Sequence, residues 1–129
     1  MGQAAPNERV VAVIDDDQSV RGAIRSLLRS LGFRVETFAS AEDFLDARPA
    51  GIGCLILDVR LSGMSGLDLQ QRLAVTGDAP PIVFISAHAD QVARQQTLAA
   101  GAIAFLRKPF AEAALIDAVR RAFGFPATS

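Results

Sequence analysis

The 129-residue sequence has no tryptophan or tyrosine, only one cysteine, and no strong imbalance of charge. Thirteen basic and fourteen acidic residues give a formal net charge of -1, so we expect no direct binding of nucleic acid. The single thiol, Cys54, cannot form a disulfide within the chain. With 50% hydrophobic residues, the composition indicates one compact domain that needs no disulfide or structural metal.

Long hydrophobic runs are also absent, and the first apolar stretch begins only at Val10. No run approaches the ~20 residues of a membrane-spanning helix, so we expect no association with a membrane. The first residues, MGQAAPNE, have neither the basic segment nor the apolar stretch of a secretory signal. We predict a cytoplasmic protein with a leader over residues 1–8, one domain over residues 9–124 and a tail over residues 125–129.

Short apolar runs alternate with segments whose apolar residues recur at helical spacing, which is typical of a parallel α/β sheet. The predicted strands are Val10–Ile14, Phe33–Phe38, Cys54–Leu57, Ile82–Ile85 and Ile103–Leu106. The first, third and fourth runs are almost wholly apolar, as expected of strands covered on both faces. The second run alternates between apolar and polar residues, which favours an edge position.

Five helices are predicted between and after these strands. The first carries an apolar stripe at helical spacing, made of Val20, Ile24, Leu27, Leu28 and Leu31. Polar residues suited to an N-cap predict where the next three helices begin, and these are Ser40, Ser65 and Asp90. A last helix is expected from about Ala111 to Phe123.

Polar residues that stand out follow the carboxyl ends of four predicted strands. They are Asp15, Asp16 and Asp17 after the first strand, Asp58 at the third, Ser86 at the fourth and Lys108 beyond the fifth. The carboxyl ends of parallel strands share one edge of the sheet, so these side chains are expected to converge. Clustered carboxylates repel one another unless a cation joins them, and such oxygen ligands favour Mg²⁺. Mg²⁺ beside a carboxylate and a lysine favours phosphoryl transfer, with the carboxylate as nucleophile.

In their order and spacing, several blocks of the sequence resemble the receiver domain of two-component response regulators, the CheY-like superfamily. These blocks are VIDDDQSVR, LILDVRLSGMSG, VFISAH and AAGAIAFLRKPF. The resemblance covers about residues 9 to 123 and is most similar to the FixJ-type receivers of nitrogen fixation. It implies a single-domain, doubly wound, flavodoxin-like sandwich with a five-stranded parallel sheet in the order 2-1-3-4-5 and five helices.

The resemblance also implies the roles of the acidic residues. Asp58 would accept a phosphoryl group from the phosphohistidine of a sensor histidine kinase or a histidine phosphotransfer protein. Asp16, Asp58 and the backbone carbonyl of Arg60 would bind Mg²⁺ directly, and Asp15 would act through water. The chain would catalyse only its own aspartyl phosphorylation and dephosphorylation, and it would not be an enzyme toward other molecules.

Four further residues take roles from the same resemblance. Lys108 would hold the phosphoryl oxygens, positioned by a cis bond to Pro109. Ser86 would donate its hydroxyl to the phosphoryl group, and Ser86 and Phe105 would form the switch pair. The resulting change of surface would act on a downstream effector protein or domain, with homodimer formation on phosphorylation as one form of the response.

Other polar residues have simpler interpretations. Asp17 is interpreted as a solvated residue or the cap of the first helix and is left out of the site. His88, the only histidine, would either influence access to the site or lie exposed in a loop. Arg21, Arg25 and Arg29 repeat every fourth residue, and the exposed face of a helix is favoured over a docking stripe for an acidic partner.

Ser62 departs from the family pattern, because these loops commonly carry proline after the position held by Leu61. Serine leaves the free loop more conformational entropy, so altered rates are expected rather than lost phosphorylation. Two other functions are less well supported than a phosphorylated receiver. The intact set of acids, Ser86 and Lys108 argues against a phosphorylation-independent interaction module. A phosphatase with an aspartate nucleophile would need a cap or longer loops, for which this chain has no room.

Overall fold

Five strands and five helices alternate in the computed structural model, which describes residues 10–47, 49–77, 79–88 and 90–125. The strands are β1 (Val10–Ile14), β2 (Arg34–Phe38), β3 (Ile52–Asp58), β4 (Ile82–Ser86) and β5 (Ala104–Arg107). The helices are α1 (Gln18–Ser30), α2 (Ala41–Ala47), α3 (Gly66–Thr76), α4 (Gln91–Ala99) and α5 (Glu112–Ala122). The predicted leader, and residues 126–129 of the predicted tail, lie outside the described residues.

The strands form one parallel sheet in the order β2-β1-β3-β4-β5, so the predicted fold class is confirmed. Every residue of β1 and β4 is buried, as the apolar runs predicted for strands covered on both faces. The edge position predicted for β2 is also confirmed. β2 lies at one edge of the sheet, and its first residues alternate in burial. Arg34 and Glu36 are exposed and Val35 is buried, because successive side chains of a strand point to opposite faces.

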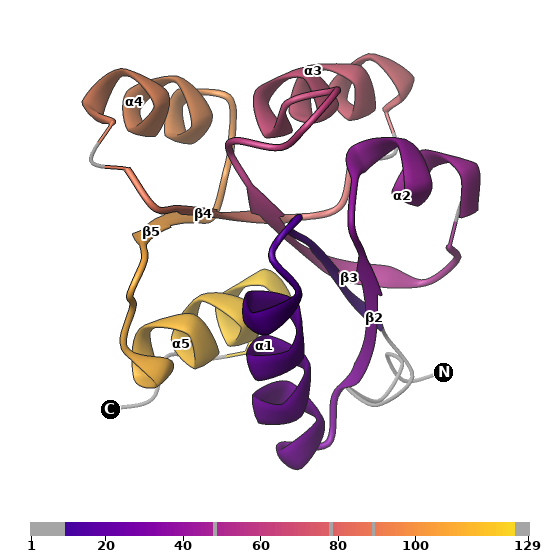
Figure 1. Ribbon diagram of the computed structural model, residues 1–129, viewed down its shortest axis with the longest axis vertical. Coiled ribbons are helices and arrows are strands. Elements are labelled where there is room, and N and C mark those ends of the chain that lie inside the picture. The colour runs from indigo at the N-terminus through magenta and orange to yellow at the C-terminus, as the bar shows by residue number, and fades with distance from the viewer. Residues whose placement is uncertain (1–9, 48, 78, 89, 126–129) are drawn as a thin grey trace.

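Helices cover both faces of the sheet, with α1 and α5 on one face and α2, α3 and α4 on the other (Figure 1). Successive side chains of β1 point to opposite faces. Val11 and Val13 pack in a hydrophobic cluster with α1 and α5. Ala12 and Ile14 pack in a second cluster with residues of α2, α3 and α4. Helices therefore cover both faces of the sheet, and the loops that follow the strands lie at its carboxyl edge.

Side-chain caps fix where four of the helices begin. The predicted cap Ser40 accepts at Oγ from the backbone N–H three residues on, in the first turn of α2, over 3.0 Å. Asp17 Oδ1 accepts a hydrogen bond from the backbone N–H of Ser19 over 2.8 Å, which confirms its interpretation as the cap of α1. Ser65 caps α3 and Asp90 caps α4, as predicted. Each such cap contributes about 1 kcal/mol to stability. Each of these caps lies in a loop that follows the carboxyl end of a strand, so the residues that start the helices also fix those loops.

Several strands begin or end one or two residues from the expected positions, and the start of β3 and the end of α1 have clear structural reasons. β3 begins at Ile52 rather than Cys54, because Gly53 continues the strand while leaving room for an aromatic ring. A Cβ atom at Gly53 would lie 2.1 Å from Cε1 of Phe123. Leu31 was expected in the buried stripe of α1, but it is 48% exposed because it is the C-cap residue, where the chain leaves the helix.

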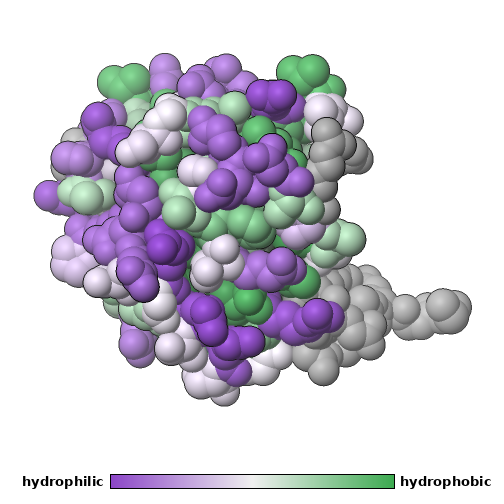
Figure 2. Space-filling model, turned by 45° about the vertical axis from the view of Figure 1, so that its right-hand side comes forward, coloured by the Kyte–Doolittle hydropathy of each residue, from purple (hydrophilic) through white to green (hydrophobic). Residues whose placement is uncertain are grey.

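The surface mixes hydrophilic and hydrophobic side chains in small patches on the face shown in Figure 2. The exposed large hydrophobic residues of the described ranges are Leu31, Val75 and Val92, which belong to three different helices or their ends. Within those same ranges, no helix combines the length and the apolar character that crossing a membrane requires. Single exposed apolar residues of this kind are ordinary on a folded domain.

Candidate functional site

Charged side chains at or just beyond the ends of three strands meet at the carboxyl edge of the sheet. Asp15 follows β1, Asp58 ends β3 and Lys108 follows β5. The Lys108 ammonium donates hydrogen bonds to Asp15 Oδ2 over 2.7 Å and to Asp58 Oδ2 over 3.1 Å. Asp15 is fully buried and Asp58 is 5% exposed. Residues 15 and 108, which are far apart in the sequence, therefore share one ion pair in a largely buried place.

Asp16 completes a cluster of three carboxylates. One oxygen from each of Asp15, Asp16 and Asp58 lies within 4.8 Å of the others. Both Asp15 oxygens already have partners, since Oδ1 accepts from the Asp17 N–H over 2.8 Å and Oδ2 accepts from Lys108. Asp16 is exposed, so its carboxylate is open to solvent. This donor set fits a hard divalent cation such as Mg²⁺, because it supplies carboxylate oxygens and leaves room for water.

Burial and hydrogen bonding oppose each other in the protonation of this cluster. Burial raises the pKa of Asp58, while the hydrogen bond from the Arg60 N–H and the nearby Lys108 ammonium lower it, leaving a net rise. Burial alone would lower the pKa of Lys108, but its hydrogen bonds to Asp15 and Asp58 raise it overall. Lys108 is therefore held as a cation. Three carboxyl groups share one lysine in this cluster, so a divalent cation would supply positive charge that the cluster lacks.

Two backbone contacts hold the acids in place. Arg21 donates from Nη1 to the Asp15 carbonyl over 2.7 Å and is half-buried. The expectation that Arg21 lies on the exposed face of α1 is therefore wrong, because its guanidinium folds back over the end of β1, whereas Arg25 is exposed. A Cβ atom on Gly66 would lie 2.3 Å from the Asp58 carbonyl oxygen, so only glycine permits α3 to start this close to β3.

Ser86 lies near this cluster, but its hydroxyl forms hydrogen bonds with the backbone of the following loop. It is fully buried, and its hydroxyl donates to the His88 carbonyl over 3.2 Å while accepting from the His88 N–H over 3.1 Å. The register of β3 and β4 pairs Asp58 with Ile85, which places Ser86 one residue beyond Asp58. The His88 side chain is exposed. The hydroxyl is thus near the site, and its present partner is the backbone of the following loop.

Phe105 and Pro109 lie on the β5 side of the site. Phe105 is 8% exposed and packs in the hydrophobic cluster that includes Ala93 of α4. Its carbonyl accepts a hydrogen bond from Arg94 Nη1 over 3.4 Å. The Lys108 N–H donates to the Ser86 carbonyl over 2.7 Å, and the Lys108–Pro109 peptide bond is cis. The β5 end therefore connects the lysine to both β4 and α4.

Comparison with known proteins decides the family. The family model described as the response regulator receiver domain matches residues 11–120. The chain belongs to the response regulator receiver family. This confirms the recognition made from the sequence blocks. Receivers are signalling modules, and they typically use Mg²⁺ at an acidic pocket.

The relatives of this receiver include transcriptional and other response regulators. TmoT, a response regulator protein of Ectopseudomonas mendocina, is 49% identical over 116 residues, which are 89% of this chain and 53% of TmoT. FixJ of Azorhizobium caulinodans is 41% identical over 120 residues, covering 92% of this chain and 57% of FixJ. The structure of the response regulator StyR superposes with a TM-score of 0.85 at 50% identity, covering 91% of this chain and 60% of that chain. The receiver spans about half the length of the curated relatives it matches.

An ion pair that the sequence did not predict connects the receiver's acidic site to α4. Arg60 Nη2 lies 3.3 Å from Asp90 Oδ2, while Asp90 Oδ1 caps α4 through the Ala93 N–H. Sequence reasoning assigned Asp90 only the cap, because nothing in the spacing of residues 60 and 90 indicates a contact. The pair is exposed, so its contribution to stability is small.

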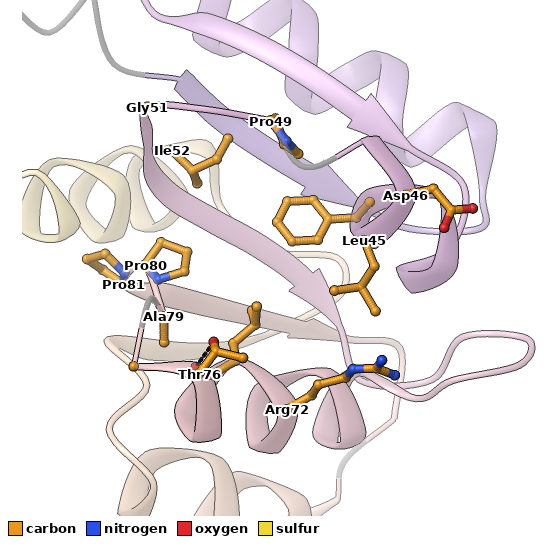
Figure 3. A pocket seen from close by; sticks show the side chains of 13 residues that line it. Leu45, Asp46, Pro49, Gly51, Ile52, Arg72, Thr76, Ala79, Pro80 and Pro81 are labelled. Atoms are coloured by element: carbon orange, nitrogen blue, oxygen red, sulfur yellow. Dashed lines mark hydrogen bonds between the residues drawn. The ribbon is translucent and has the colours of Figure 1, made fainter.

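A recess lies at the opposite, amino-terminal edge of the receiver's sheet, between α2 and α3 (Figure 3). It has a volume of about 1020 Å³. Leu45 and Asp46 come from α2, Arg72 and Thr76 from α3, and prolines 80 and 81 precede β4. Its charged lining residues, Asp46 and Arg72, are exposed. The recess therefore has volume without the buried, paired charges of the acidic site.

Proposed function

We propose that this receiver takes a phosphoryl group onto Asp58 with the help of Mg²⁺ and changes the surface that it offers to a partner. The observation that carries this proposal is the position of Asp58. Its carboxylate is nearly buried, lies within a cluster of three acids and accepts a hydrogen bond from Lys108. A carboxylate held between a cation site and a lysine suits nucleophilic attack on phosphorus.

Contacts of the acids support a division of labour toward Mg²⁺. Asp16 is exposed and Asp58 faces the same cluster, so these two carboxylates, with the Arg60 carbonyl, would bind the ion directly. Both Asp15 oxygens are engaged by Asp17 and Lys108, which supports a role through water. Bound Mg²⁺ would supply positive charge for the oxygens of the phosphoryl group.

The transfer itself needs one bond to form and one to break. An oxygen of the Asp58 carboxylate forms a bond to phosphorus as the N–P bond of the donor's phosphohistidine breaks. The electron pair of that bond stays on the imidazole nitrogen of the donor. The Lys108 ammonium has three N–H donors, and Asp15 and Asp58 use two of them. The third is therefore available to a phosphoryl oxygen.

Ser86 and Phe105 are proposed as the residues that transmit the reaction to the surface. The Ser86 hydroxyl would leave the His88 carbonyl and donate to a phosphoryl oxygen. Phe105 is already buried against the α4 side of the sheet, so its part in the switch would be a repacking with α4. A charge-assisted hydrogen bond contributes roughly 1.5–3 kcal/mol, enough to shift a two-state surface about ten- to hundredfold.

The phosphodonor is proposed to be a sensor histidine kinase or a histidine phosphotransfer protein. Such a donor must dock next to Lys108, and an apolar recess of about 420 Å³ adjoins that residue. Side chains of α1 and α5 line it, together with Lys108 and Pro109. The output would pass to an effector protein or domain, or to a second copy of the chain. A cytoplasmic location and a receiver over residues 9–124 belong to the same proposal.

A phosphorylation-independent interaction module is the alternative. Such a module would keep the fold and need no complete acidic site. The convergence of Asp15, Asp16, Asp58 and Lys108 favours the phosphorylated receiver. Burying charged groups costs desolvation free energy, and clusters of such groups occur most often at functional sites.

Incubation with acetyl phosphate tests the proposal. Intact-mass spectrometry should show one added phosphate in the presence of Mg²⁺ and none when a chelator removes the ion. Asp58→Ala should take no label, while Asp117→Ala, which removes an exposed carboxylate from α5, should be labelled like the parent. Equal labelling of Asp58→Ala and the parent would contradict the proposal, as would labelling that persists in chelator.

A further inference from the structure

The loop between β3 and α3, residues 59–65, is held at its far end by a side chain from a neighbouring helix. Glu42, in the first turn of α2, accepts a hydrogen bond at Oε2 from the backbone N–H of Met64 over 2.8 Å. Gly63 has a φ of 80°, and a Cβ atom there would lie 2.6 Å from the same oxygen. The carboxylate therefore lies directly against the backbone of the loop, at a position that only glycine leaves open.

The near end of the loop is fixed by the sheet. The Val59 N–H donates to the Ile85 carbonyl over 3.0 Å, and the Arg60 N–H donates to Asp58 Oδ1 over 3.0 Å. Between these anchors and Met64, Ser62 is exposed and stands where the family pattern has proline. Proline would reduce the conformational freedom of this stretch, and serine does not. The contact with Glu42 restricts the same stretch from outside.

We propose that Glu42 is a positioning residue for phosphorylation, because it holds the β3–α3 loop in the conformation that presents the Arg60 carbonyl to Mg²⁺. The inference rests on the function proposed above. Glu42 touches neither the acidic cluster nor the phosphoryl group in this account, and it acts only through the loop. It does from α2 what a proline at position 62 would do within the loop itself.

The chemistry of the contact fits this role. The hydrogen bond from Met64 lowers the pKa of Glu42, so the side chain is a carboxylate at neutral pH. A hydrogen bond to an ionised acceptor is stronger than one between neutral groups. Glu42 is exposed, which limits the strength of the contact and makes it suited to restricting a loop rather than to holding the fold together.

Titration of Mg²⁺ against single variants, followed by NMR or calorimetry without any phosphodonor, gives the first test. Glu42→Ala should weaken Mg²⁺ affinity about two- to tenfold, the range expected from loss of one hydrogen bond at an exposed site. Glu42→Gln retains an acceptor oxygen and should lose less. Asp43→Ala is the matched control, since it removes an exposed carboxylate from the same turn of α2 and should leave the affinity unchanged.

A second substitution separates positioning from general damage. Ser62→Pro in the Glu42→Ala background should restore Mg²⁺ affinity and the rate of labelling by acetyl phosphate, whereas it should change the parent little. Unchanged affinity in Glu42→Ala, or failure of the proline to restore it, would overturn the inference. A parent that binds Mg²⁺ but takes no label would instead refute the proposed function, while the titrations still decide whether Glu42 orders the loop.

Discussion

The two ends of the sheet use their polar residues in opposite ways. At the carboxyl edge, Asp15 and Asp58 are buried and share the ammonium of Lys108. At the amino edge, the recess between α2 and α3 is lined by Asp46 and Arg72, which are both exposed (Figure 3). Exposed charges cost the protein little, whereas buried charges are retained only when they are paired. The buried, paired charges therefore favour the carboxyl edge as the place of the proposed chemistry.

The comparison is tested most strongly by removing one cation from each end. Lys108→Met leaves the fully buried Asp15 and the nearly buried Asp58 without their shared partner, so we expect a loss of about 3 kcal/mol in the free energy of unfolding without Mg²⁺. Arg72→Met at the amino edge should leave stability unchanged. Urea denaturation of both variants measures the difference, and equal losses would break the distinction between the two ends.

Two glycines of similar crowding extend the comparison. Gly66→Ala would push a Cβ against the Asp58 carbonyl, and Gly53→Ala would push one against the Phe123 ring. Both changes should cost about 2 kcal/mol in stability, because each overpacks a tight contact. Only Gly66→Ala should also weaken Mg²⁺ binding, since it displaces the backbone of Asp58.

Gly22→Ala supplies the control for these two variants. Gly22 lies within α1 and has no atom within 4 Å of an added Cβ, so alanine should stabilise the protein by about 0.5–1 kcal/mol. Chemical denaturation gives the stabilities, and calorimetric titration gives the Mg²⁺ affinities. If Gly53→Ala lowered Mg²⁺ affinity as much as Gly66→Ala, the two ends of the sheet would be coupled rather than distinct.

The parallel α/β class could be predicted from periodicity, whereas the strand order followed from the resemblance to receiver domains. All five strands run in the same direction, so their carboxyl ends bring residues such as Asp15 and Lys108 to one edge of the sheet. The caps Ser65 and Asp90 could be predicted because they act on backbone atoms three residues away.

Contacts between side chains and distant loops could not be predicted in this way. Arg21 has the spacing of an exposed helical arginine, and only the three-dimensional course of the chain shows that it bonds to the Asp15 carbonyl. Glu42 and Met64 are 22 residues apart, and no pattern connects them. The start of β3 was misjudged because the role of Gly53 depends on the Phe123 ring, which lies at the other end of the sequence.

The pH dependence of stability should sharpen the contrast at Asp58. Because the folded state raises the pKa of Asp58, it binds more protons than the unfolded chain between the two pKa values. The contribution of Asp58 to stability therefore falls as pH rises through that window, and the ionised group destabilises the fold above it. Asp58→Asn should then be more stable than the parent at pH 7 in chelator, by about 1 kcal/mol, because it removes the cost of burying a negative charge and also the repulsion with Asp15.

This advantage of Asp58→Asn should shrink as pH falls below the ordinary range of a carboxyl group, where Asp58 is neutral in both states. Saturating Mg²⁺ should also reduce it, because the ion stabilises the parent more than the variant. Denaturation curves of both proteins at several pH values, with and without Mg²⁺, provide the measurement. An advantage that is independent of pH, or a variant less stable than the parent at pH 7, would contradict the pKa shift.

The smallest effect is expected at the loop after β1, where Arg21 contacts the backbone of Asp15. Arg21→Ala removes the donor to the Asp15 carbonyl, and since water can reach this half-buried contact, we expect a loss of no more than about 1 kcal/mol. Arg25→Ala, one turn further along α1, removes an exposed arginine and should change nothing measurable. A drop of two- to threefold in Mg²⁺ affinity for Arg21→Ala alone would show that the backbone of Asp15 positions the acidic cluster, and equal behaviour of the two variants would return Arg21 to the exposed face that the sequence predicted.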